Sequence, residues 1–557
     1  MADQPTHHRG DQPTRHRNAL TGAGRLTRLA LRRDRVQLPV WILATTLLAA
    51  TTHASVRKQF PTEAERITVL RTAVDAPAIL MLRNAPTGTG DGDLMAFQIL
   101  AFLAVLAGFM STLAVVRHTR QNEETGRAEL LGSTAVGRYA ALTAALVVTA
   151  GANLVLVGLL TLTLVGNGLP VAGSVAFGLG VGAAGLTFAA VAAIAAQLSQ
   201  SARTANGIAA ASIGIGYLVR GLGDAFGQVH ADGYTMTTAW PTWFSPIGWA
   251  TLVQPYAGNR WWVLALPAAL VVAGLGTALA LNARRDLGAG LLADRPGPAT
   301  AARGLLSPLG LAWRLQRGTL LGWAVAVGVF GVTVGSLSGA VEQAFSDSTG
   351  AARTLRELGG GSGSLVDAFY AAMLAMVGAM VAGYVVQALL RVRAEESTGR
   401  AEPTLATATG RLRWLGGHLV VVLLGAVALL GLAGLATGLV AGLTVGDLGD
   451  RTTDLTVAAL VQVAPALILG GFVLTVFGLL PRLAVGLGWA GFTLSLVLGQ
   501  LGELLNLPRA VRDISPFSHV PALPAAELSA TPLLLLGAVA VALGGAGLLL
   551  FRRRDLA

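Results

Sequence analysis

Long apolar stretches alternate with short polar and charged stretches along almost the whole chain. A transmembrane helix needs about 20 consecutive apolar residues, and about twelve stretches approach that length. In the first half the expected spans are residues 38–54, 94–116, 139–166, 170–197, 204–222 and 261–281. In the second half they are residues 319–340, 368–390, 414–445, 455–480, 483–501 and 532–551. The pattern therefore predicts an all-α polytopic membrane protein with about twelve transmembrane helices.

The chain before the first span has a different pattern. Residues 1–19 are polar and contain prolines, so we expect a disordered basic tail without the apolar core of a signal peptide. From residue 20 to residue 37, leucines such as Leu26 and Leu29 alternate with arginines such as Arg25 and Arg28. A helix with one apolar and one basic face is typical of a helix that lies on the membrane surface.

A charged motif follows the second expected span and occurs again about half a chain later. The first copy reads Glu123-Glu124-Thr125-Gly126-Arg127-Ala128-Glu129 and is followed by Gly137-Arg138. The second copy reads Glu396-Ser397-Thr398-Gly399-Arg400-Ala401-Glu402 and is followed, after the same interval, by Gly410-Arg411. A polar motif that recurs within an otherwise apolar chain indicates a function outside the membrane.

Four further short sequences recur in the same order in both halves. They are Arg32-x-x-Arg35-x-x-Leu38-x-x-Trp41 with Arg314-x-x-Arg317-x-x-Leu320-x-x-Trp323, Arg203-x-Ala205-x-Gly207 with Arg482-x-Ala484-x-Gly486, Ser245-Pro246 with Ser515-Pro516, and Arg284-Arg285-Asp286-Leu287 with Arg553-Arg554-Asp555-Leu556. They predict two tandem six-helix repeats of the same orientation, residues 20–287 and 304–557. Residues 288–303, rich in glycine and proline, form the expected cytoplasmic connector.

Composition and charge agree with a membrane protein. Only 12% of the 557 residues are charged and the mean hydropathy is +0.63, whereas soluble domains carry about 25% charged residues. The net charge of +11 comes from arginines that gather at the ends of spans, which is the topology signal of membrane proteins. We therefore expect membrane lipids rather than nucleic acid as partners, and both termini and both charged motifs on the cytoplasmic side.

Several kinds of chemistry are excluded by residues that the sequence lacks. The absence of cysteine excludes disulfides and thiolate metal sites, and the eight histidines show no metal-ligand spacing. Lys58 is the only lysine and no glycine-rich loop precedes it, so the chain has no P-loop. We expect no catalytic residue, no metal and no cofactor bound by this chain.

The motif Glu123-x-x-Gly126-Arg127-x-Glu129-Leu130-Leu131, with Gly137-Arg138, resembles the cytoplasmic signature of type-2 (type V-like) ABC exporter permeases. The resemblance covers nearly the whole chain, and the fused halves resemble duplicated permeases described as exporters of polyketide antibiotics, including tetronasin-type transporters. It implies, in each half, a surface helix before the first span, a coupling helix after the second and a partly re-entrant segment before the sixth. In the first half the aromatic residues 240–249 would form that last segment.

The resemblance also implies a partner. A separate ABC nucleotide-binding subunit, expected in two copies, would bind ATP and magnesium and would contact one motif in each half. The residues expected to couple to this ATPase are Glu123, Gly126, Arg127, Glu129, Leu130, Leu131 and Arg138, and Glu396, Gly399, Arg400, Glu402 and Arg411. In the second copy Pro403 replaces Leu130, so a helix there is expected to begin near Pro403. The alternative interpretation of both charged motifs is a solvated loop that only fixes the membrane topology. Topology, however, depends little on glutamates.

The expected function is the permease subunit of an exporter in the bacterial cytoplasmic membrane, which moves small hydrophobic or amphipathic compounds outward. Candidate substrate contacts are Gln98, Asn153 and Gln387, although for these, and for Gln197, His418 and Gln462, hydrogen bonding between helices is favoured. An ion-driven multidrug carrier remains an alternative, but such carriers use acidic or histidine residues inside the membrane, which are scarce here. An intramembrane lipid-modifying enzyme is a weaker alternative, because no catalytic constellation is visible.

Overall fold

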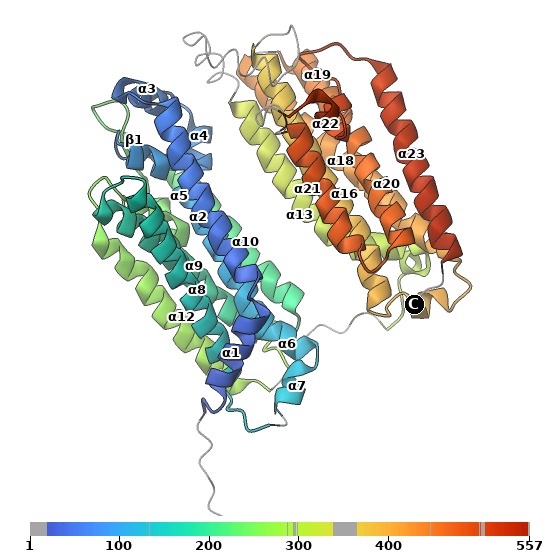
Figure 1. The fold of residues 1–557 in the computed structure, drawn as a ribbon, viewed down its shortest axis with the longest axis horizontal. Coiled ribbons are helices and arrows are strands. Elements are labelled where there is room, and N and C mark those ends of the chain that lie inside the picture. Colours follow the sequence, from blue (N-terminus) through green and yellow to red (C-terminus); the bar gives the residue numbers. More distant parts are fainter. Residues whose placement is uncertain are drawn as a thin grey trace, which may run out of the picture. The chain divides into compact units, whose positions relative to one another are not determined.

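The computed structural model describes residues 19–132, 134–286, 288–292, 297, 299–337, 365–445, 447–500, 502 and 507–554. The expected tail, residues 1–19, lies outside this part of the chain except for its last residue. The chain divides into two compact units, Met1–Pro296 and Gly297–Ala557 (Figure 1). Both units consist mainly of long helices.

Unit 1 is built around α5 and α9, which pack against each other and are the most buried long helices of the unit. Their close approach depends on small side chains, since a Cβ on Gly108 would lie 2.9 Å from the ring of Phe188. The elements of this unit are α1 (Ala23–Arg33), α2 (Gln37–Gln59), α3 (Glu63–Val74), α4 (Pro77–Leu82), α5 (Asp91–His118), α6 (Arg120–Glu124), α7 (Arg127–Gly132), α8 (Ala140–Gly166), α9 (Val171–Leu198), α10 (Ala202–Ala225), β1 (Gln228–Val229), β2 (Met236–Thr237), η1 (Trp240–Phe244), α11 (Pro246–Leu252), η2 (Trp261–Leu264) and α12 (Ala265–Arg284).

The short elements of unit 1 gather at its two ends. Helices α1, α6 and α7 lie at one end, and α3, α4 and β1 lie at the other (Figure 1). The strands β1 and β2 pair antiparallel as the only sheet among the described residues. The charged motif therefore lies beside the amphipathic helix α1, at one end of the long helices.

Unit 2 repeats the pattern of long helices with small residues at their contacts. A Cβ on Gly547 of α23 would lie 2.7 Å from the backbone of Leu474 in α20, so these two helices pack closely. The elements of this unit are η3 (Arg303–Leu306), α13 (Pro308–Ser336), α16 (Leu365–Ser397), α17 (Glu402–Leu405), α18 (Arg411–Val445), α19 (Leu448–Leu460), α20 (Val463–Leu479), α21 (Ala484–Gln500), α22 (Arg509–Arg512), η4 (Pro516–His519) and α23 (Ala530–Arg553).

Within the described residues, 10 helices are long and apolar enough to cross a membrane. The fifth and eleventh expected spans do form helices, α10 and α21, but neither is among those 10. Helix α10 carries the ion pair Arg220–Asp224 and α21 has only 17 residues. The tenth expected span, 455–480, corresponds to α19 and α20, which together form one candidate span, Leu448–Leu479. The structure is thus that of a polytopic helical membrane protein.

A separate helix before the first long helix, as expected for a surface helix in both halves, is present only in unit 1. There α1 ends at Arg33 and a turn at residues 34–36 separates it from α2. In unit 2, α13 runs without a break from Pro308 to Ser336, after the short η3. Ser307 caps the start of α13, because its hydroxyl accepts a hydrogen bond from the backbone of Gly310 at 3.0 Å.

Candidate coupling site

The glycine of the charged motif is a helix-ending residue in both units. Gly126 follows α6 and Gly399 follows α16, and each has φ +70°, in the left-handed region that only glycine adopts without strain. After Gly126 the chain starts α7 at Arg127, whereas after Gly399 it starts α17 at Glu402. The second helix of the motif thus begins next to Pro403, as the sequence predicts.

The first glutamate of the motif in unit 1 joins three segments of the chain. Glu123 lies 2.8 Å from Arg120 and 2.6 Å from Arg285, which follows α12. Arg285 also donates to Gln197 at 2.5 Å, and Arg120 to the carbonyl oxygen of Ala196 at 2.8 Å, both at the end of α9. The side chains of Arg120, Glu123 and Arg285, here called the Glu123 cluster, are 0%, 10% and 5% exposed. The cluster therefore holds α6, α9 and the end of α12 together.

Unit 2 contains the same arrangement. Glu396 lies 3.6 Å from Arg393 and pairs with Arg554, which follows α23. We call Arg393, Glu396 and Arg554 the Glu396 cluster. The guanidinium of Arg554 lies over the rings of Phe477 and Phe551, at 4.8 and 5.5 Å. In both units, then, the motif glutamate pairs with the second arginine of the recurring Arg-Arg-Asp-Leu sequence.

The arginine that ends each motif contacts the same place. Arg138 donates to the carbonyl oxygen of Arg285 at 3.2 Å, and Arg411 donates to that of Arg554 at 2.8 Å. A cation there satisfies a carbonyl group at a helix C-terminus. Sequence reasoning did not pair these segments, although their joint recurrence in both halves was a signal that could have done so.

The rest of each motif faces outward. Arg127 and Glu129 are exposed, and Leu130 is 75% exposed on α7. In the second copy Arg400, Glu402 and Pro403 are exposed. Arg400 also lies 3.6 Å from Glu395. Leu131 lies in α7, but its side chain is outside the described part of the structure. Each motif therefore combines an inner glutamate with an exposed outer surface.

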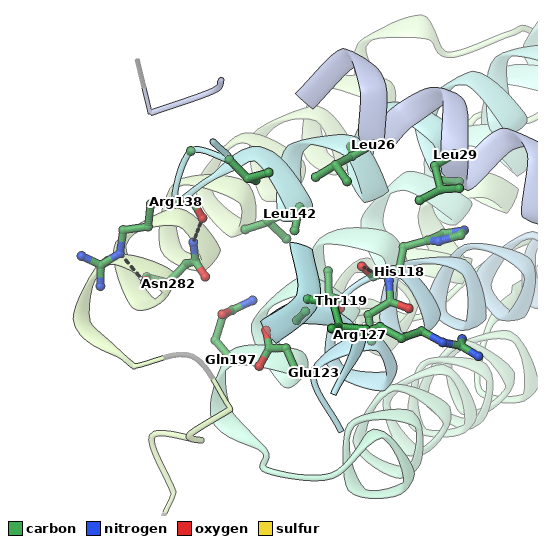
Figure 2. A pocket seen from close by; sticks show the side chains of 18 of the residues that line it. Leu26, Leu29, His118, Thr119, Glu123, Arg127, Arg138, Leu142, Gln197 and Asn282 are labelled. Carbon is green, nitrogen blue, oxygen red and sulfur yellow. Dashed lines mark hydrogen bonds between the residues drawn. The ribbon is translucent and has the colours of Figure 1, made fainter. Parts of the chain in front are cut away.

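A cavity of about 840 Å³ lies beside the first motif. Figure 2 shows Leu26 and Leu29 of α1 on one side of it, Glu123 and Gln197 facing the space, and Arg138 hydrogen-bonded to Asn282. Residues of α5, α6, α7, α8, α9 and α12 complete its walls. This cavity separates the amphipathic helix α1 from the charged motif.

A buried charged group fixes α1 next to this cavity. Asp34 ends α1 with its side chain 1% exposed, 2.7 Å from Arg117 and 2.6 Å from His118, at the end of α5. Burial alone would raise the pKa of Asp34, but hydrogen bonds and charge from His118 and Arg117 outweigh it and hold the pKa below its ordinary value. Asp34 therefore stays ionised and ties the end of α1 to the end of α5, just before the motif.

Most candidate substrate contacts already have partners inside their unit. Asn153 donates to Ser111 at 2.9 Å across α8 and α5, and Gln387 accepts from Trp323 at 2.8 Å. Gln98 is half-buried on α5. A role of these residues in substrate binding stays a prediction. Among the described residues, no group of three histidine or acidic side chains could hold a metal ion.

Three other polar residues in or near the spans are also bonded or buried inside their unit. Gln197 accepts from Arg285 at 2.5 Å, and His418 lies 2.9 Å from Gln316. Gln462 is buried between α19 and α20. For Gln197 and His418 the contacts hold one segment of a unit to another.

Taken together, these features define a polytopic helical membrane protein with the same charged cluster at the end of the last long helix of each unit. Residues 305–552 match the family described as "Multidrug efflux system permease Rv1217c, C-terminal domain". The chain is 39% identical over 541 residues to the multidrug efflux system permease protein Rv1217c of Mycobacterium tuberculosis (strain ATCC 25618 / H37Rv), an alignment that covers 97% of this chain and 96% of the relative. The chain belongs to this family of permeases, which are transporter membrane subunits and not enzymes.

Proposed function

We propose that the chain is the membrane permease subunit of an ATP-driven ABC exporter in a bacterial cytoplasmic membrane. It would move hydrophobic or amphipathic compounds, antibiotic-like or lipid-like, out of the cytoplasm or the inner leaflet. Whole-length similarity to a multidrug efflux system permease supports this class of cargo. Polyketide antibiotics are the narrower cargo that the sequence resemblance suggests. ATP and magnesium would bind to a separate ATPase subunit, and both termini would lie in the cytoplasm.

The observation that carries the proposal is that the motif is built in the same way in both units. Besides the two clusters, Ser245 donates to the carbonyl oxygen of Gly216 at 2.6 Å, and Ser515 donates to that of Ser495 at 2.7 Å. These repeated contacts support an internal duplication with two tandem six-helix repeats and twelve spans. Two equivalent motifs in turn favour two ATPase copies, one for each unit.

The Glu123 cluster suggests how a push on the motif reaches the helices. An ATPase that contacts Arg127 and Leu130 would press on α7, which follows α6 directly. Because Glu123 of α6 is paired with Arg285, a displacement of α6 would be passed to α12 as well as to α5. The buried ion pairs are short and shielded from water, so they resist stretching more than exposed pairs do. The Glu396 cluster would act in the same way on α16 and α23.

The sharpest test combines copurification with a charge reversal at Arg127. The full chain is expressed with candidate ABC ATPases, purified, and reconstituted for ATP hydrolysis and export. We expect an ATPase to copurify, and Arg127→Glu to leave the permease folded while export per ATP hydrolysed falls. Arg71→Glu is the matched control, because Arg71 is exposed on α3 at the opposite end of unit 1. Export on a proton gradient without any ATPase would show an ion-driven carrier, and normal coupling in Arg127→Glu would reject the docking role.

A further inference from the structure

The cavity beside α1 has walls of two kinds. Leu26 and Leu29 of α1 and Leu142 of α8 supply apolar surface. Its charged lining consists of the four arginines Arg33, Arg127, Arg138 and Arg285, with only the two carboxylates Glu123 and Asp286, and His118. A space lined by both apolar and cationic side chains fits a molecule that has both an acyl chain and an anionic group.

The positive charge of this cavity is not cancelled internally. Arg33 donates to the neutral amide oxygen of Asn122 at 2.8 Å, and the guanidinium of Arg127 makes no hydrogen bond or ion pair with another described residue. Glu123, by contrast, is already paired with two arginines. An anion that enters the cavity therefore meets two guanidinium groups whose charge is uncompensated.

The position of the cavity favours a lipid as the occupant. Helix α1 is amphipathic and precedes the candidate span α2, so its leucines would lie at the depth where headgroups meet acyl chains. A volume of about 840 Å³ is large enough for a headgroup and the first part of the chains. If the motif faces the cytoplasm, as we expect, the adjacent leaflet is the one rich in anionic lipids.

We propose that this cavity binds one anionic phospholipid, with its phosphate next to Arg33 and an acyl chain along Leu26 and Leu29. The bound lipid is a structural ligand that fills the space between α1 and the motif. It is not the transported compound, and its binding does not require the ATPase. Failure of lipid binding would therefore not reject the proposed export function. Failure of ATP-driven export would likewise not reject the lipid site.

The test is native mass spectrometry of the full purified chain, titrated with phosphatidylglycerol or with phosphatidylcholine of the same acyl chains. We expect one tightly bound phosphatidylglycerol and weaker binding of phosphatidylcholine. Arg33→Gln should lower the affinity for phosphatidylglycerol about fivefold, the effect of one arginine near an anionic headgroup. Ala141→Trp, which fills the cavity without a change of charge, should remove most of the tight binding.

The matched control is Arg28→Gln, since Arg28 is exposed on the same helix but does not line the cavity. An equal loss in Arg28→Gln and Arg33→Gln would show general attraction to a basic helix and would overturn the proposal. Inorganic phosphate binding as tightly as phosphatidylglycerol would show an anion site without a lipid, which also overturns it. So would an Ala141→Trp protein that keeps its tight lipid but loses a copurifying ATPase, because the cavity would then hold the ATPase.

Discussion

Replacing Glu123 by glutamine removes the only anion of the Glu123 cluster while keeping the size of the side chain. In the native protein Glu123 accepts hydrogen bonds from Arg120 at 2.8 Å and from Arg285 at 2.6 and 2.8 Å. The neutral amide leaves both guanidinium groups buried without a counter-charge. We expect the segment that joins α5 to α7 to open far more often in this variant.

The burial of the cluster sets the size of this effect. Arg120 is 0% exposed and Arg285 is 5% exposed, so neither cation can recover much hydration when the carboxylate is lost. Breaking a buried ion pair by removal of one partner costs about 3–5 kcal/mol. Glutamine retains one oxygen acceptor, which places the cost near the lower value, about 3 kcal/mol. That free energy corresponds to an opening equilibrium more favourable by a factor of about 100.

Amide hydrogen exchange of residues 119–132, measured by mass spectrometry, reports this opening directly. Glu124→Gln is the matched control, because Glu124 is exposed and accepts one backbone hydrogen bond, from Ala202 at 3.0 Å. We expect the control to change the exchange rates by less than about fivefold, the range of a surface polar contact. Equal exchange rates in Glu123→Gln and Glu124→Gln would refute the view that the cluster holds this segment closed.

Two further predictions concern the ends of the same region. Folding lowers the pKa of Asp34 from its ordinary value of 3.8. The ionised Asp34 carboxylate therefore stabilises the fold fully above pH 3.8, and this stabilisation is lost as the pH falls through the lowered pKa of the folded protein. Asp34→Asn should thus lower the melting temperature at about pH 7, and this loss should shrink in acid. The exposed control Asp75→Asn should leave the melting temperature unchanged. A loss of melting temperature in Asp34→Asn that is as large in acid as at about pH 7 would reject this reasoning. Gly126→Ala should destabilise the loop by about 1–2 kcal/mol through strain at φ +70°. The control Gly166→Ala, where a Cβ has equal space, should cause no such strain. Limited proteolysis compares the two variants, and equal cleavage would contradict the strain argument.

The apolar pattern predicted the long helices well because each span is a local property of the sequence. Helix α9 runs over Val171–Leu198, close to the expected residues 170–197. The count of twelve spans is not confirmed, since α10 and α21 are helices whose length or polarity sets them apart from the 10 candidate spans. Asp34 likewise gave no signal as a break between two helices, because its partners lie at the end of α5, more than 80 residues away.

The charged motif was recognised from its repetition, but its inner contacts were not predicted. Glu123 and Arg285 are 162 positions apart, and nothing in the local pattern shows which glutamate turns inward. As a result, Glu123 was grouped with Arg127 as a residue for contact with a partner. In the folded unit, Glu123 is 10% exposed and already paired, whereas Arg127 faces outward. If both residues serve coupling, Arg127 would receive a displacement from a partner and Glu123 would transmit it.

The two units differ inside and outside the clusters. Inside them, the Arg120–Glu123 pair of unit 1 is 2.8 Å long with Arg120 0% exposed, whereas the Arg393–Glu396 pair of unit 2 is 3.6 Å long with Arg393 21% exposed. The recurring Arg-x-x-Arg-x-x-Leu-x-x-Trp sequence places Gln316 where unit 1 has Asp34. Gln316 lies within the unbroken helix α13 and bonds to His418, so unit 2 lacks at this position the charged tie between surface helix and motif. Pro403 likewise stands where unit 1 exposes Leu130. Unequal docking of an ATPase would arise from these outer features, and unequal transmission from the longer motif pair of unit 2. The surfaces of α1, α7 and α17 would then decide which unit is displaced first.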